Sequence, residues 1–450
     1  MKRILALLIV SALLVGVLAA CGGNDAPSAT PPPAASDDTP AADDTPPADE
    51  GPSIIGEGGS VQLKMSTWWG GDSAATFEDV IRAWIVHEPD IQVELMVWPW
   101  NEYPDMITTS FAANDAPDIL KMDQTRDFQQ YYFTGILESL DSYAAALNYD
   151  MSNWIPDQIE SHTYDGQLVG VPIHREQQTL WWNPGLFEMA GVPPLSDQPT
   201  WDEVRTAAAA ISALGTDDEG REYKGVEMGG YTPLVYAFLD RGIDYVTADG
   251  GLDFDNPAVI DAFETVMEIA ILYGTERTDA FDPFQSNLVG MRLGDWFGGI
   301  NETGRYLDFE LRGANFPVSN AGDPQILFVC ANSLGLNSNG NYKDESAQFI
   351  FFFSSDEAQW ILRNITLSPF YGPAREELEV PSDSFPFNVG EIIKGQPNAR
   401  MGTFPKTPWL LPFNRTLSGN FVSARHGEIT VAEYVEDIQL AVDDWFSANR

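Results

Sequence analysis

The sequence predicts an α/β protein whose sheets are mainly parallel. Apolar and polar residues alternate over residues 61–67 and again over 91–97, a pattern typical of strands. Between these two segments, the apolar positions 77, 80, 81, 84 and 85 recur at helical spacing. Strands that alternate with helices along a chain favour a parallel sheet with helices on both faces.

The length and composition indicate a globular body of two domains. The chain has 450 residues, and 44% of them are hydrophobic. From residue 61 onward it is long enough for two domains of ordinary size, about 150 residues each. We therefore expect two α/β lobes, each with a core of its own.

The first twenty residues have the features of a secretion signal. Two basic residues, Lys2 and Arg3, precede a mostly apolar run that is shorter than the roughly 20 residues of a membrane-spanning helix. The run ends in Leu-Ala-Ala-Cys, which resembles the bacterial lipobox, where cleavage leaves the cysteine as a lipid-carrying N-terminus. We expect a signal peptide over residues 1–20, lipid on Cys21, and attachment to a membrane through that lipid.

Residues 21–60 are predicted to be a disordered tether. After Cys21 the segment is rich in Pro, Ala, Asp, Thr and Gly, with eight acidic residues and no Lys or Arg. Such a composition buries too little apolar surface to offset the loss of chain entropy on folding. The tether would hold the folded body away from the membrane surface.

Charge and residue usage exclude several classes of function. The net charge of −43 argues against nucleic acid, because phosphate binding needs clusters of Lys and Arg. The four histidines show no metal-ligand spacing, and Cys330, within an apolar run, has no second cysteine once Cys21 carries lipid. No phosphate-binding loop, Gly-x-Ser-x-Gly or Cys-x-x-Cys motif is present. We expect no cofactor, no metal site and no catalytic residues.

The expected strand ends carry aromatic and acidic side chains. Trp68 and Trp69 follow the strand at 61–67, and Asp72 or Ser73 can cap the helix that comes next. A further helix is expected at about 104–113 and a third strand from residue 116, which puts Asp123 near its end. Ligands of such sheets bind beyond the carboxyl ends of the strands.

A longer stretch, residues 168–204, indicates a boundary between lobes. An apolar strand over 168–173 leads into the polar residues 175–179, after which 180–182 predict a second strand. Thr200 and Glu203 then form a capping box for a helix with an apolar stripe.

The tryptophans predict a carbohydrate ligand. The chain has 13 of them, and several stand at expected strand ends, including Trp69 and Trp296. A flat ring covers the C–H face of a sugar while carboxylates, amides and guanidinium groups bond its hydroxyls. Only one of Trp181 and Trp182 should face the ligand, because neighbours in a strand alternate. The remaining tryptophans considered have helical spacing and are expected in the core: Trp84, Trp201, Trp360 and Trp445.

The order of several motifs resembles a known family. WWGG, APDIL, GQLVGVP, LWWNPGLFEMAGV and TWDEV are followed by ADGGLDFDNPAVIDAFETVMEI, LVGMRLGDWFGGI and FIFFFSSDEAQWIL. Together they resemble the extracellular solute-binding proteins of ABC sugar importers, the family of maltose-binding protein. Trp182-Asn183-Pro184 replaces the Tyr-Asn-Lys of many members, so maltose itself is not implied.

The resemblance implies the two-lobed periplasmic-binding-protein-like fold, with a ligand cleft and a hinge between the lobes. It implies lobe 1 from residues 61–173 with 316–364, and lobe 2 from 174–315 with 365–450. It also implies a monomer that binds a small sugar and delivers it to the transmembrane subunits of an ABC permease. The candidate ligand-binding residues are Trp69, Asp72, Asp123, Glu176, Tyr231, Trp296 and Tyr371.

Two other functions fit parts of the pattern. Aromatic boxes lined with carboxylates also bind amines, so a cationic ligand such as a polyamine is an alternative. A secreted glycoside hydrolase would need two acids roughly 5 to 10 Å apart across the scissile bond. A neutral mono- or oligosaccharide fits best, because an anionic ligand would be desolvated against the negative field unless Arg126 or Arg175 paired with it.

Overall fold

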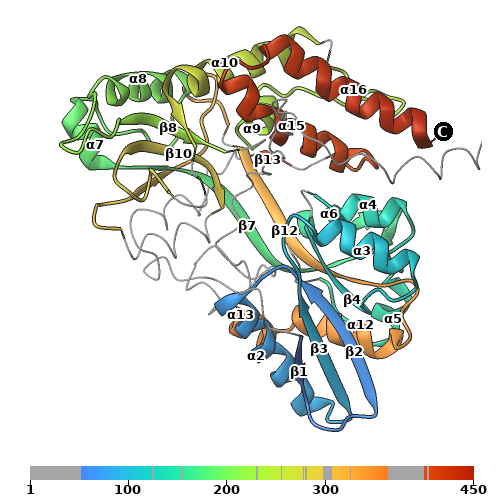
Figure 1. Ribbon diagram of the computed structural model, residues 1–450. Coiled ribbons are helices and arrows are strands. Elements are labelled where there is room, and N and C mark those ends of the chain that lie inside the picture. Colours follow the sequence, from blue (N-terminus) through green and yellow to red (C-terminus); the bar gives the residue numbers. More distant parts are fainter. Residues whose placement is uncertain are drawn as a thin grey trace, which may run out of the picture. The chain divides into compact units, whose positions relative to one another are not determined.

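The computed structural model describes most of the body of the chain (Figure 1). The described residues are 52–123, 126–152, 154, 156–229, 232–254, 256–276, 278, 281–296, 307–324, 326–362, 400–402 and 405–449. The expected signal peptide, Cys21 and most of the tether lie outside them. Within them, no helix is both long enough and apolar enough to cross a membrane.

One sheet of 11 strands runs through the described residues, in the order β1-β3-β2-β4-β12-β7-β10-β8-β9, with β11 on β7 and β13 on β12. The strands of this sheet are β1 (Ser53–Ile55), β2 (Val61–Thr67), β3 (Ile91–Val97), β4 (Ile119–Asp123), β7 (Val171–Trp182), β8 (Lys224–Met228), β9 (Gly274–Thr275), β10 (Val289–Trp296), β11 (Arg312–Ala314), β12 (Ile326–Leu336) and β13 (Arg400–Gly402). A separate pair consists of β5 (Thr163–Tyr164) and β6 (Gln167–Leu168).

Helices alternate with these strands along the chain, which confirms the predicted α/β class (Figure 1). They are α2 (Gly71–His87), α3 (Tyr103–Ala112), α4 (Phe128–Phe133), α5 (Asp141–Ala146), α6 (Pro156–Ser161), α7 (Pro184–Ala190), α8 (Trp201–Ser212), α9 (Thr232–Asp240), α10 (Pro257–Tyr273), α12 (Lys343–Phe353), α13 (Asp356–Leu362), α15 (Leu410–Arg425) and α16 (Val431–Asn449).

The sheet is mixed, with parallel pairs on each side of two antiparallel central strands. β2 is parallel to β3 and β4, and β8 is parallel to β9 and β10. β12 is antiparallel to β4 and β7, and β7 is antiparallel to β10 and β11. The strands of the first parallel group, β2, β3 and β4, therefore run antiparallel to those of the second group, β8, β9 and β10.

Two large hydrophobic cores form at opposite ends of β7. One core draws on residues 55–173 and 334–362, with Trp84, Phe77 and Phe349 among its buried members. The other draws on residues 180–316 and 409–442, and Phe316 stacks there on Tyr236 with ring centroids 3.7 Å apart. Each core is covered mainly by helices of its own part of the chain.

The middle of the chain differs from the sequence-based expectation of two strands around a polar crossing. β7 is one continuous strand from Val171 to Trp182, and the polar residues lie within it. The two partner strands of β7 explain this continuity, because β12 pairs with residues 171–177 and β10 pairs with residues 178–182. Backbone pairing along the whole strand overrides the local change in side-chain polarity.

Some local expectations hold and others are wrong. The capping box of α8 is present, with Thr200 and Glu203 bonded in both directions. At α2 the N-cap is Gly70 without a side-chain cap, so the expected cap by Asp72 or Ser73 is wrong. The folded body also begins earlier than residue 61, because Ile55 is buried and β1 adds an antiparallel edge to β3.

Of the four tryptophans expected in the core, three lie in or against a core and one does not. Trp84 and Trp201 are buried and Trp445 packs against the second core, but Trp360 is 55% exposed, so its assignment to the core is wrong. Trp181 and Trp182 are both buried, Trp181 in a small cluster with Phe284 and Trp182 against Phe187. Which of this pair faces a ligand stays a prediction.

Candidate functional site

Three parallel strands of the first core end at one edge of the sheet. Thr67 of β2 is in register with Val97 of β3, and the amide of Trp98 donates to the carbonyl of Thr67 at 2.9 Å. β4 ends beside them at Asp123, which is in register with Asn332 of β12. The residues that follow these strand ends therefore gather where the central strand β12 passes.

A buried lysine lies against the faces of two tryptophans at this edge. The Nζ of Lys121 is 3.1 Å from the ring centroid of Trp68 and 3.8 Å from that of Trp69. It also donates to Oδ1 of Asn332 at 2.6 Å. A desolvated ammonium group over an indole ring is a strong cation–π contact, so Lys121 fixes both rings in the first core.

An arginine lies against a third tryptophan at the same edge of the sheet. The Cζ of Arg126 is 3.5 Å from the ring centroid of Trp100, and its Nη1 donates to the Trp100 carbonyl at 2.7 Å. Its Nε and Nη2 donate to Oδ2 of Asp127 at 3.1 and 2.6 Å. One guanidinium thus holds the ring and the backbone of Trp100 and is itself held by a fully buried carboxylate.

The Arg126–Asp127 pair is shielded from water, and each group affects the other's ionisation. Burial works against the charged form of Arg126. Attraction from Asp127 and Asp123 outweighs this effect of burial and raises the pKa of Arg126. Burial also raises the pKa of Asp127, against the lowering effect of Arg126. The pair therefore brings little net charge to the strand ends.

Tyr103 connects the strands beneath this cluster. Its hydroxyl donates to the carbonyl of Lys121 at 2.8 Å and lies 2.7 Å from Oγ of Ser66. Its ring meets Trp68 edge-on at 5.0 Å, and Trp68 meets Trp100 in the same way at 5.0 Å. Burial raises the pKa of Tyr103 far above its ordinary value, so the hydroxyl stays protonated. We call Trp68, Trp69, Trp100, Tyr103, Lys121, Arg126 and Asp127 the strand-end cluster.

The structure brings together two of the predicted site residues. Trp69 belongs to the strand-end cluster, where it is 8% exposed and meets Phe77 edge-on at 5.2 Å. Asp123 is buried beside the cluster, and its amide donates to Oδ1 of Asp127 at 2.8 Å.

For the other predicted residues, the structure describes the backbone alone or nothing. Asp72 lies in the first turn of α2, Glu176 of β7 is in register with Cys330 of β12, and Trp296 ends β10. Their side chains are not among those described. Tyr231 and Tyr371 lie outside the described residues.

Sequence reasoning missed several members of the cluster. Trp100 follows β3 as Trp69 follows β2, so the same rule about strand ends could have found it. Lys121 interrupts an otherwise apolar segment just before Asp123, and a charged residue in a fully buried strand is an unusual signal. Arg126 was expected as a possible partner for an anionic ligand, yet the donors described contact Asp127 and Trp100.

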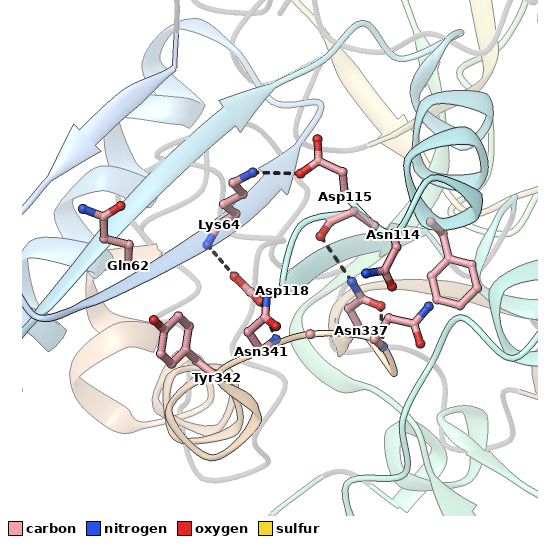
Figure 2. Close-up of a pocket in the computed structure, with 12 residues that line it drawn as sticks. Gln62, Lys64, Asn114, Asp115, Asp118, Asn337, Asn341 and Tyr342 are labelled. Atoms are coloured by element: carbon pink, nitrogen blue, oxygen red, sulfur yellow. Dashed lines mark hydrogen bonds and ion pairs between the residues drawn. The ribbon is translucent and has the colours of Figure 1, made fainter.

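A separate pocket lies toward the amino ends of β2 and β4 (Figure 2). Its volume is about 110 Å³, and Lys64 and Asp115 form an ion pair of 3.2 Å on its wall. Asp118 accepts from the amide of Lys64 at 2.9 Å, and Nδ2 of Asn337 donates to the carbonyl of Pro117 at 3.0 Å. These contacts join loops to the sheet. Among the described residues, no group of three or more His, Cys, Asp or Glu could hold a metal ion.

Comparison with known proteins identifies the class. The model of the bacterial extracellular solute-binding protein family matches residues 70–360, more than half of the chain. The chain belongs to this family. Putative binding proteins of Brucella abortus and Brucella suis are 27% identical to it over 227 residues, which is 48% of this chain and 53% of theirs. The chain thus spans about half the length of these curated relatives.

Another relative and two solved structures agree with this class. An arabinooligosaccharide-binding protein of Halalkalibacterium halodurans is 22% identical over 57% of this chain and 58% of its own. An ABC substrate-binding protein of Listeria monocytogenes in complex with cycloalternan has a TM-score of 0.73 at 17% identity, covering 86% of this chain and 99% of that one. UgpB of Mycobacterium tuberculosis in complex with glycerophosphocholine has a TM-score of 0.72 at 16% identity, covering 87% and 100%. The predicted two-lobed fold is confirmed.

Proposed function

We propose that the protein captures a neutral mono- or oligosaccharide outside the cytoplasm and delivers it to the transmembrane subunits of an ABC permease. Membership of the solute-binding family supports capture without chemistry. The relative named for arabinooligosaccharides and the structural neighbour in complex with cycloalternan support a sugar.

The pairing of cations with aromatic rings in the strand-end cluster carries this proposal. A cationic ligand would need aromatic faces and carboxylates that are available to it. Here Lys121 lies against Trp68 and Trp69, and Arg126 lies against Trp100. The carboxylate of Asp127 already binds Arg126. A neutral ligand needs no counter-charge, so it fits this cluster better than a polyamine does.

We also propose how the lobes are divided. The two hydrophobic cores favour a division close to the expected one, with lobe 1 from residues 61–173 and 316–364, extended at its start by β1, and lobe 2 from 174–315 and 365–450. The stacking of Phe316 on Tyr236 favours a second boundary a few residues after 315. β7 and β12 pair along both groups of strands, so bending within these two strands would serve as the hinge.

The proposal extends to the location and partners of the protein. The Leu-Ala-Ala-Cys sequence supports a lipid anchor on Cys21, followed by the acidic tether. We propose a monomer on the outer side of the cell membrane, with the permease as its protein partner. Trp69, Asp72, Asp123, Glu176, Tyr231, Trp296 and Tyr371 remain our proposed ligand contacts.

We further propose that the protein does not turn over its ligand. A protein that closes over an intact sugar for hand-over gains nothing from a general acid. Incubation with oligosaccharides should release no reducing sugar. Release that is abolished by Glu176→Gln would instead indicate a glycoside hydrolase.

A ligand screen tests the proposed function. Thermal unfolding would be measured with neutral sugars, uronates, glycerophosphodiesters and diamines, each at the same concentration. A ligand at about 100 times its dissociation constant stabilises the folded state by about 2.7 kcal/mol. We expect a neutral sugar to raise the unfolding temperature, and Trp296→Ala to weaken its binding by about 2 kcal/mol. Stabilisation by a diamine or glycerophosphodiester, with neutral sugars silent, would overturn the proposal.

A further inference from the structure

We infer that Trp100 is the residue of the first lobe on which the sugar stacks, and that Arg126 and Asp127 hold its ring in position. This inference rests on the proposed function. It assigns the stacking role in this lobe to a residue outside the set predicted from the sequence, and Trp69 keeps only the role of a neighbouring contact.

Exposure separates the tryptophans at this edge of the sheet. Trp68 and Trp69 are 4% and 8% exposed, and Lys121 lies against a face of each ring. Trp98 and Trp100, which follow β3, are both partly exposed. A ligand that arrives at the strand ends therefore meets the rings after β3 more readily than those after β2.

The contacts of Trp100 make it the better platform of these two. Arg126 covers one face of its ring at 3.5 Å and also bonds its carbonyl oxygen, so the ring and the backbone are fixed by one group. Arg126 in turn is fixed by two donor bonds to the buried Asp127. A ring that is held from behind loses little conformational freedom on binding, which favours affinity.

Trp98 provides a natural comparison within the same turn. Its ring lies 5.9 Å from Tyr103, at a tilted angle, and no cation contact is found for it among the described residues. It has the same residue type and the same class of exposure as Trp100, two positions away. A general effect of losing an indole from this turn would affect both variants equally.

The cation behind Trp100 also bears on the class of ligand. A guanidinium on one face of an indole draws electron density toward itself, so a positive group on the opposite face is less favourable. The apolar C–H face of a pyranose carries no such charge and is tolerated better. The Arg126–Trp100 stack thus selects a neutral sugar over an amine.

Titration calorimetry on matched variants tests the inference. Maltotriose, mannotriose and arabinotriose would each be titrated into wild type, Trp100→Ala, Trp100→Phe, Trp98→Ala and Trp69→Ala. We expect Trp100→Ala to weaken binding about 30-fold or more, as loss of an anchoring aromatic does, and Trp100→Phe to retain part of the affinity. Trp98→Ala should change affinity by less than about threefold. Trp69→Ala should lower the unfolding temperature without ligand more than it weakens binding.

Arg126→Met, combined with Asp127→Asn so that no buried carboxylate is left unpaired, tests the positioning role. It leaves the indole in place but removes the group behind it, so we expect weaker sugar binding at an unchanged number of sites. It should also remove much of the preference for neutral sugars over putrescine, a readout that loss of stability alone would not change. If Trp100→Ala fails to fold, Trp100→Phe and the double variant Arg126→Met with Asp127→Asn decide the question.

The outcomes distinguish a failure of the stacking inference from a failure of the proposed sugar-binding function. Undiminished binding by Trp100→Ala, or equal losses in Trp100→Ala and Trp98→Ala, would overturn this inference and leave the sugar-binding function standing. If wild type binds none of these three oligosaccharides and no neutral sugar of the thermal screen, the proposed function fails, and the stacking role fails with it.

Discussion

Lys121 and Asn332 are 211 positions apart in the chain, yet Nζ of Lys121 donates to Oδ1 of Asn332 at 2.6 Å. The bond ties β4 to β12, and it does so where the register between β12 and β7 shifts, between Asn332 and Ser333. Both residues are almost completely buried. The same ammonium group contacts Trp68 and Trp69, so this pair links the strand-end cluster to the central strands.

We predict that the two residues are energetically coupled. Lys121→Met should lower the free energy of unfolding by about 1–3 kcal/mol, because a buried hydrogen bond to a charged group is lost. Asn332→Leu should also destabilise, and the double variant should cost less than the sum of the two by roughly 1 kcal/mol. Urea unfolding of the four proteins measures this difference. Strictly additive effects would show that the bond contributes nothing of its own.

Local signals in the sequence predicted local structure well. The capping box of α8 depends on Thr200 and Glu203, three positions apart, and both of its bonds are present. The class of the fold followed from strand and helix periodicity, which is likewise local. Trp69 and Asp123 were both found near the carboxyl ends of strands by the general rule for α/β sheets.

Features that depend on distant partners were not predictable in this way. β7 continues through its polar residues because β12 and β10, more than a hundred positions away, supply its hydrogen bonds. The polarity of residues 175–179 gave no sign of those partners. Lys121 is buried because Asn332 and two indole rings receive it, and no spacing within its own segment indicates that arrangement.

Stability should depend on pH through the capping box of α16. Oε2 of Glu433 accepts from the amide and the hydroxyl of Thr430, both at 2.8 Å, and these bonds lower the pKa of Glu433. A lowered folded-state pKa stabilises the protein above the unfolded value of about 4.3, and the stabilisation is lost as the pH falls through the folded value. Wild type should therefore exceed Glu433→Gln in stability at pH 6, with the gap closing toward pH 3.

The Gln variant isolates this contribution, because its amide oxygen can still accept from Thr430. Repulsion among the many acidic groups also changes with pH, but it changes almost equally in both proteins. Urea midpoints at several pH values give the comparison. A gap that stays constant from pH 6 to pH 3 would argue against the lowered pKa of Glu433.

The proposed lipid anchor predicts a change in location. Cys21→Ser removes the only side chain proposed to carry lipid, so the protein should leave the membrane fraction and appear as soluble protein. Fractionation of cells that express each version, followed by detection with an antibody, measures the shift. Ser28→Ala, a change within the tether, should leave the membrane association intact. Continued sedimentation of Cys21→Ser with membranes would contradict lipid attachment at this site.

The ligand should bind with little dependence on salt. The chain has 67 acidic and 24 basic residues, so a charged ligand would experience a strong field that salt screens. At the strand ends, the carboxylate of Asp127 compensates Arg126, and Nζ of Lys121 is occupied by Asn332 and two rings. Affinity for a neutral sugar should therefore change by less than about threefold between 0.02 and 0.5 M salt. Galacturonate and putrescine, titrated in the same buffers, serve as comparisons. Tight binding of one of them, with an affinity that falls steeply as salt rises and no binding of neutral sugars, would show that the ligand is charged. The strand-end cluster would then recognise the ligand through groups other than Lys121, Arg126 and Asp127.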